Sequence, residues 1–143
     1  MVKIYTTKKQ LKGVTNFMQI GPGPFHQNMI WAPGHNYIDE DVFWVFENII
    51  EAYYPTYDHY EFDNDIPRET MKEIIAELVV VEALAAYVDN KALAGLLRRK
   101  YFTDSLSENM VLNRKQFVSF FHRVIALFAK LSEENPITTI IGV

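Results

Sequence analysis

Hydrophobic residues recur every three or four positions in three parts of the chain, which is the spacing of a helix that buries one face. The first part runs from about residue 40 to 54, the second from about 67 to 88, and the third from about 113 to 133. In the first part, apolar side chains share one side of the helical wheel and acidic side chains share the other. The pattern therefore predicts three helices.

Residues that favour helix ends stand at the expected places. Asp39 can cap the first helix, and Pro55 ends it, because proline lacks the N–H that a further helical turn needs. Asp65 can cap the second helix in the same way, and Asn113 can cap the third. A further short helix over about 91–101 is left open, since a central glycine weakens it.

The second half of the middle helix, from Leu78 to Val88, is apolar nearly all round, as expected of a helix at the centre of a bundle. We therefore predict a mainly α protein, a single-domain helical bundle around a central apolar helix. A chain of 143 residues fits one domain, because it can bury about 70% of its unfolded surface in one core. The domain, 1–143, divides into a loop-rich N-terminal segment (1–38), a helical core (39–133) and a tail (134–143).

Both ends of the chain leave alternatives open. Residues 3–7 fit a short strand or hairpin, whereas Thr7 and Gln10 fit a capping box that opens a helix. The Gly-Pro repeat at 21–24 predicts a turn, which makes the N-terminal segment mostly loop. The apolar, β-branched tail over 137–143 either packs back on the domain or pairs as a strand.

The modest net charge of −4 hides a strong asymmetry along the chain. Residues 1–12 carry +4, residues 13–67 carry −9, and residues 68–143 carry +1. The middle stretch contains no Lys or Arg, although an even spread would place about five there. It also holds both tryptophans and twelve of the twenty aromatic residues. A stretch that is both anionic and aromatic is suited to binding a basic protein surface.

Composition excludes several classes of protein. Without cysteine there is no disulfide scaffold, thiol catalysis or Cys-ligated zinc. No apolar run has the length of a signal peptide or a membrane span, so we expect a cytoplasmic protein with no membrane partner. The excess of acids argues against direct binding of nucleic acid, because phosphate binding needs clustered cations. No cofactor is expected.

The sequence contains no motif of an enzyme, so we predict that the protein is not one. No serine stands in a G-x-S-x-G motif, and no Gly-rich turn is suited to cradling phosphate. Glu82 lies within an apolar run and needs a partner when it is buried. We expect that partner to be Arg98, Arg99, Arg123 or a tyrosine rather than a substrate.

The candidate binding residues are acids and aromatics between positions 39 and 63. Trp44 falls on the acidic side of its helix, a composition typical of a binding hot spot. Glu47 and Glu51 lie one helical turn apart and can accept Lys or Arg from a partner. The predicted partner-binding residues are Asp39, Glu40, Asp41, Trp44, Glu47, Glu51, Tyr54, Tyr57, Asp58, Tyr60, Glu61 and Asp63.

The chain combines an acid-rich stretch, from Tyr37 to Asp65, with a predicted helical remainder. In this it resembles the immunity proteins of bacterial toxin–immunity systems, including those of contact-dependent growth inhibition. The resemblance is one of type and rests on no sequence motif. It implies a one-to-one complex with a cognate basic protein toxin, commonly a nuclease, whose active-site cleft the immunity protein covers. The carboxylates would then meet basic side chains of the toxin, with apolar anchors from Trp44, Tyr54, Tyr57 and Tyr60.

Two other functions stay open. His26, His35 and His59 lie near acids in the sequence, and these are ligand types for zinc or iron. A small metal-dependent hydrolase is therefore one alternative, although no short paired-histidine motif joins the three. The other alternative is a non-catalytic adaptor that forms a homodimer through its aromatic patch.

Overall fold

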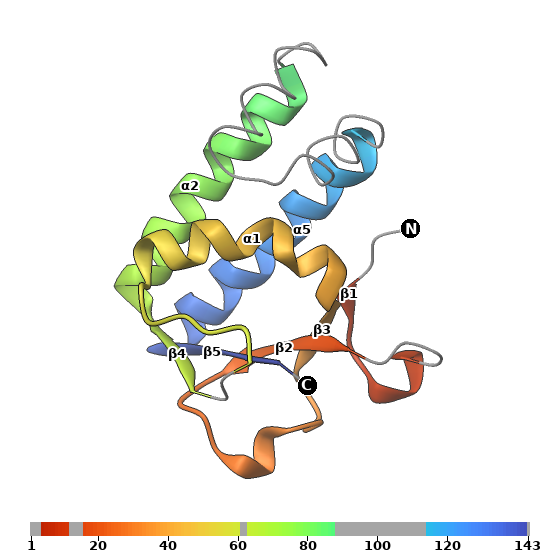
Figure 1. The fold of residues 1–143 in the computed structure, drawn as a ribbon, viewed down its shortest axis with the longest axis vertical. Helices are drawn as coiled ribbons and strands as arrows, with labels where there is room; N and C mark the ends of the chain where they lie inside the picture. The colour runs from red at the N-terminus through yellow and green to blue at the C-terminus, as the bar shows by residue number, and fades with distance from the viewer. Residues whose placement is uncertain (1–3, 12–15, 61–62, 88–113, 143) are drawn as a thin grey trace.

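The computed structural model describes residues 4–11, 16–60, 63–87 and 114–142. Within them, an antiparallel sheet of five strands is covered on one face by three long helices (Figure 1). The strands are β1 (Ile4–Tyr5), β2 (Phe17–Pro22), β3 (Asn36–Asp39), β4 (Asn64–Pro67) and β5 (Ile137–Gly142). The helices are α1 (Glu40–Tyr53), α2 (Arg68–Tyr87) and α5 (Arg114–Glu134), with short 3-10 turns at η1 (Lys8–Leu11) and η2 (Gln27–Met29).

The strands lie in the order β1-β3-β2-β5-β4, and each neighbouring pair is antiparallel. The last strand in sequence, β5, lies between β2 and β4. Its residue Ile140 is opposite Ile20 on one side and opposite Asn64 on the other. The C-terminal segment therefore joins the N-terminal strands to the strand that leads into α2.

The hydrophobic core lies between the sheet and the helices. Alternate residues of the central strands, such as Ile20 and Ile140, are fully buried in it. Phe46 of α1 packs against Phe120 and Phe121 of α5, with ring centroids 5.6 Å and 4.8 Å apart. Each fully buried side chain of this size stabilises the fold by roughly 1.5–3 kcal/mol.

The opposite face of the sheet carries the loop 23–35, which Figure 1 shows on the side away from the helices. Gln19 of β2 is fully buried beneath it. Its Nε2 donates to the Met29 carbonyl (2.6 Å), and its Oε1 accepts from the Trp31 N–H (3.0 Å). The same Nε2 lies 2.8 Å from His35 Nδ1. These buried polar contacts hold the loop on the sheet, so β2 is covered on both faces.

The predicted mainly α bundle is wrong, because the described residues form an α+β fold. Strand β2 is buried on both faces and therefore lacks the polar–apolar alternation that reveals a half-exposed strand. Its last residues, Gly21 and Pro22, are typical turn formers. The middle helix is not central either, since Val79 and Val80 of α2 are each 48% exposed.

The three long helices begin and end within one or two residues of the predicted positions. The N-terminal segment is not mostly loop, because three strands come from it. It combines both readings of residues 3–7, with β1 as a strand and the Gln10 side chain accepting from the Thr7 N–H at 3.2 Å. Of the two alternatives for the tail, the strand is confirmed, since the tail forms β5.

Two predicted helix caps have different outcomes. Asp65 does not cap α2, because it belongs to β4 and its Oδ1 accepts from Thr139 Oγ1 (2.5 Å) and from the Phe25 N–H (3.0 Å). The cap at Asn113 and the short helix over 91–101 lie outside the described residues.

Candidate functional site

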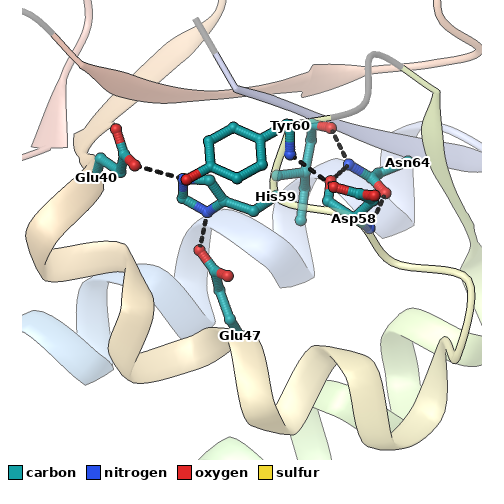
Figure 2. A network of polar contacts seen from close by, with 7 residues as sticks. Glu40, Glu47, Asp58, His59, Tyr60 and Asn64 are labelled. Carbon is teal, nitrogen blue, oxygen red and sulfur yellow. Dashed lines mark hydrogen bonds and ion pairs between the residues drawn. The ribbon is translucent and has the colours of Figure 1, made fainter.

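Most acids of the stretch 13–67 lie on α1 or in the loop that follows it, of which the structure describes residues 54–60 and 63. Two anchors fix this loop on the domain. The Tyr57 side chain is buried in the core. The buried Asn64 holds Asp58, since its Oδ1 accepts from the Asp58 N–H (2.9 Å) and its Nδ2 donates to the Asp58 carbonyl (2.6 Å), as Figure 2 shows. Residues 57–60 therefore have a defined conformation.

His59, on this loop, lies between two carboxylates of α1 (Figure 2). Its Nε2 is 2.6 Å from Glu40 Oε1, and its Nδ1 is 2.5 Å from Glu47 Oε1. The two acids are two helical turns apart and so share one side of α1. All three side chains are less than one fifth exposed. His59 is also fixed from the sheet side, where its carbonyl leaves no room for a Cβ on Gly142.

Burial and charge act in opposite directions on these groups. Burial lowers the pKa of His59, but the hydrogen bonds and charges of Glu47 and Glu40 outweigh it, so the pKa lies above its ordinary value. Burial raises the pKa of Glu47, aided by the charges of Glu40 and Glu51 and opposed by His59. His59 therefore favours its protonated form, which can donate to both carboxylates at once.

The Tyr57 hydroxyl is buried and has no hydrogen-bond partner among the residues that the structure describes. Burial raises the pKa of this hydroxyl far above its ordinary value, and the charges of Glu47, Asp58 and Glu51 add to the rise. It is therefore a neutral phenol at any physiological pH. Its role is structural, because the ring packs in the core.

Tyr60 is the exposed feature of the loop, with 75% of its surface open to solvent. Its N–H donates to Asp58 Oδ1 (2.9 Å), and Asp58 and Asp63 are both exposed beside it in the chain. Its ring stands edge-on to His59, with centroids 4.7 Å apart. A cavity of about 240 Å³ opens next to it, lined by Asn16, Glu40, His59, Tyr60 and Gly142.

The structure divides the predicted binding residues into three groups. Glu51, Asp58, Tyr60 and Asp63 are exposed, and we name these four residues the acidic face. Others are half-buried or buried: Asp39 on β3, Glu40 and Glu47 on His59, Tyr54 against the core, and Tyr57 within it. The side chains of Asp41 and Trp44, and all of Glu61, lie outside what the structure describes. Tyr57 is therefore removed from the proposed contact set.

Sequence reasoning did not join His59 to Glu40 and Glu47, nor did it single out Asn16, Asn64 or Gly142. Helical spacing links Glu40 to Glu47, but only the tertiary fold brings the other residues to them. The one usable signal was the position of a histidine inside a stretch with nine acids and no Lys or Arg. In such a stretch, a histidine is the main available cation.

The three histidines considered as metal ligands are separate in the structure. His26 is exposed, His35 contacts Gln19, and His59 contacts the two glutamates. Among the described residues, no group of three His, Asp or Glu side chains is arranged to hold a metal ion. A resident metal site has no support in that part of the chain.

Glu82 contacts a residue that was not among the expected partners, of which Arg98 and Arg99 lie outside the described residues. It is half-buried on α2, and His122 Nδ1 of α5 lies 3.2 Å from its Oε1. The pair borders a cavity of about 540 Å³ between the two helices. His122 itself is largely exposed.

No helix within the described ranges is long and apolar enough to cross a membrane. Comparison of the chain with protein-family models, with curated proteins and with solved structures gave no match. The candidate site therefore has to be interpreted from its own geometry.

Proposed function

We propose that this chain is a non-catalytic inhibitor that binds a basic protein toxin, a nuclease in the first instance, and covers its active site with the acidic face. The observation that carries the proposal is Tyr60, an aromatic ring 75% exposed between two exposed aspartates on a firmly anchored loop. Large exposed aromatics are enriched in binding hot spots, where one side chain can contribute about 2 kcal/mol or more.

Charge supports the same conclusion. Residues 13–67 carry nine acids and no Lys or Arg, so neither of these cations stands among the acids of this stretch. An anionic surface steers a basic partner toward it and accelerates association. A nuclease cleft that binds phosphate would meet carboxylates in its place, as in mimicry of nucleic acid. Such a protein would protect its own cell from within the cytoplasm.

The anchoring of the loop favours tight binding. Tyr57 and Asn64 hold the loop ends, and His59 holds its middle on α1. A surface that is ordered before binding loses less conformational entropy in the complex. Trp44 and Glu61 remain predicted contributors to the same interface.

The test begins with capture from lysate of the source cells at low salt and at about 0.5 M salt, where surface charges are screened. A captured basic protein is then purified and assayed, for nuclease activity first, with and without one equivalent of this chain. We expect capture to weaken at high salt and the activity to be suppressed in a one-to-one complex. A captured protein whose activity is unchanged in the complex would contradict the proposal.

Paired charge variants locate the interface. Glu51→Lys/Asp63→Lys reverses two exposed acids of the region, and Glu133→Lys/Glu134→Lys makes the same change at the exposed end of α5. We expect the first variant to bind the toxin at least about tenfold more weakly and the second to bind as the parent does. Equal affinity of both variants would move the interface elsewhere. Light scattering gives the molar mass of the free chain. A monomer fits the inhibitor, whereas a dimer fits the homodimeric adaptor.

A further inference from the structure

The cavity beside Tyr60 has the size and lining of a site for one charged side chain. Its volume of about 240 Å³ is below the range of roughly 300–1,000 Å³ typical of small-molecule sites. Its walls come from four places in the chain: Asn16 before β2, Glu40 at the start of α1, His59 and Tyr60 on the loop, and Gly142 in β5. The cavity therefore lies where the acidic loop meets the sheet.

The trio of Glu40, Glu47 and His59, of which Glu40 and His59 line the cavity, carries a net negative charge whichever atom holds each proton. Both ring nitrogens of His59 lie within 2.6 Å of a carboxylate oxygen, so each of the two contacts requires one proton. Two carboxylates and one imidazole that share two such protons have a net charge of −1. A cation entering the cavity would compensate this charge.

Glu40 offers an acceptor for that cation. Its Oε1 contacts His59, whereas its Oε2 points away from the ring in Figure 2 and has no hydrogen bond within the described part of the chain. The Glu40 side chain is 19% exposed, so this oxygen is partly shielded from water. A hydrogen bond from a charged donor is stronger in such a setting than on an open surface.

Tyr60 adds an aromatic surface at the mouth of the cavity. It is 75% exposed, and its edge-on contact with His59 holds the ring in place. A planar guanidinium stacks on an aromatic ring and donates to a carboxylate at the same time, which an ammonium group does less well. The lining thus favours arginine over lysine.

We infer that this cavity binds an arginine side chain of the protein partner, with the guanidinium donating to Glu40 Oε2 and stacking on Tyr60. This inference rests on the proposed function, in which the partner is a basic protein. It adds one defined contact, at which a single partner arginine is recognised by shape as well as by charge.

The test uses the folded chain and a small probe, so that no partner is needed. Nα-acetyl-arginine amide is titrated into isotopically labelled protein, and amide shifts are followed by NMR. The matched probes are the acetyl amides of lysine and of citrulline, which has the shape of arginine without its charge. We expect saturable, millimolar binding of the arginine probe with shifts at Glu40, His59 and Tyr60, about threefold or more weaker binding of lysine, and none of citrulline.

Two variants test the proposed contacts. Tyr60→Leu changes an exposed side chain and should weaken the arginine probe about threefold to tenfold without affecting the fold. Glu40→Gln should weaken it about tenfold, while Glu69→Gln, at an 83% exposed acid on α2, should have no effect. Equal binding of arginine and citrulline, or unsaturable shifts spread over all acids, would overturn the inference.

The two proposals fail separately. If the arginine probe binds in the cavity but no captured protein is inhibited, the cavity site stands and the inhibitor function falls. In the opposite case, the chain inhibits the toxin and Glu51→Lys/Asp63→Lys weakens that inhibition, but binding of the arginine probe does not saturate. The inhibitor function then stands and the cavity site falls.

Discussion

Gly21 and His35 lie in direct contact on the sheet face away from the helices, and no side chain fits between them. A Cβ on Gly21 would overlap the imidazole ring at Nδ1, the atom that contacts Gln19. His35 is only 6% exposed, so the ring has little room to move. We expect Gly21→Ala to lower the free energy of unfolding by about 1–3 kcal/mol, as other overpacked cores do. Urea denaturation measures this change.

A second substitution checks that the cost comes from this contact. His35→Ala removes the ring, so Gly21→Ala should cost much less in the His35→Ala background than in the parent. The native glycine also loses some conformational entropy on folding, which alanine would save. An equal cost of Gly21→Ala in both backgrounds would contradict the packing described here.

His35 should make the protein less stable in mild acid. Burial lowers its pKa below 6.5, and its Nδ1 accepts from Gln19 Nε2, so the folded state holds the ring neutral. As the pH falls below about 6.5, the unfolded chain binds a proton before the folded chain does, and the free energy of unfolding decreases. Urea midpoints measured between about pH 5 and 8 should show this loss. In His35→Gln the urea midpoint should depend less steeply on pH. An unchanged slope in the variant would assign the acid sensitivity to other groups.

The helices were predictable because their signals are local. Val42, Phe43, Phe46 and Ile49 recur at helical spacing, and a proline follows the last turn of α1. The sheet was not predictable in the same way. Strand β2 is buried on one face by the helices and on the other by the loop 23–35, so its residues have no alternation. Strand β5 is an apolar run whose pairing depends on β2 and β4.

The site was predictable in composition and not in arrangement. The acids and aromatics of 39–63 were identified as a group, but burial then separated Tyr57 from Tyr60, although both lie in one short loop. Glu47 was expected to face a partner, and it instead contacts His59. A loop has no periodicity from which the direction of its side chains can be read, so only the fold decides which ones are exposed.

His59 should titrate in the opposite sense to His35. Its pKa lies above 6.5 in the folded state, so its contribution to stability is fully present below pH 6.5 and is lost as the pH rises through the folded pKa. NMR titration of the imidazole should give a midpoint above 6.5. Glu47→Gln should move that midpoint down, because it removes a contacting charge, while Glu51→Gln should move it less. A midpoint at or below 6.5 would contradict the ion-paired trio.

Phe46 should be among the most sensitive core positions. Its ring contacts Phe43 within α1 and two phenylalanines of α5, and it is fully buried. Phe46→Ala should therefore cost about 3–5 kcal/mol, through lost burial and the cavity left behind. Val80→Ala on the exposed side of α2 should change stability by no more than about 0.5 kcal/mol. Similar effects of the two substitutions in urea denaturation would contradict this placement of the core.

Tyr57→Phe should stabilise the protein, in contrast to most substitutions of buried residues. The Tyr57 hydroxyl is buried and has no hydrogen-bond partner in the described part of the chain, and an unsatisfied buried polar group costs about 1–3 kcal/mol. Phenylalanine keeps the ring and removes that cost, so the urea midpoint should rise while the fold is unchanged. Binding of the proposed partner should also be unchanged, because Tyr57 lies in the core. Tyr60→Phe is the matched control: it removes an exposed hydroxyl, so it should leave the urea midpoint unchanged. A loss of stability in Tyr57→Phe would show that the hydroxyl has a partner.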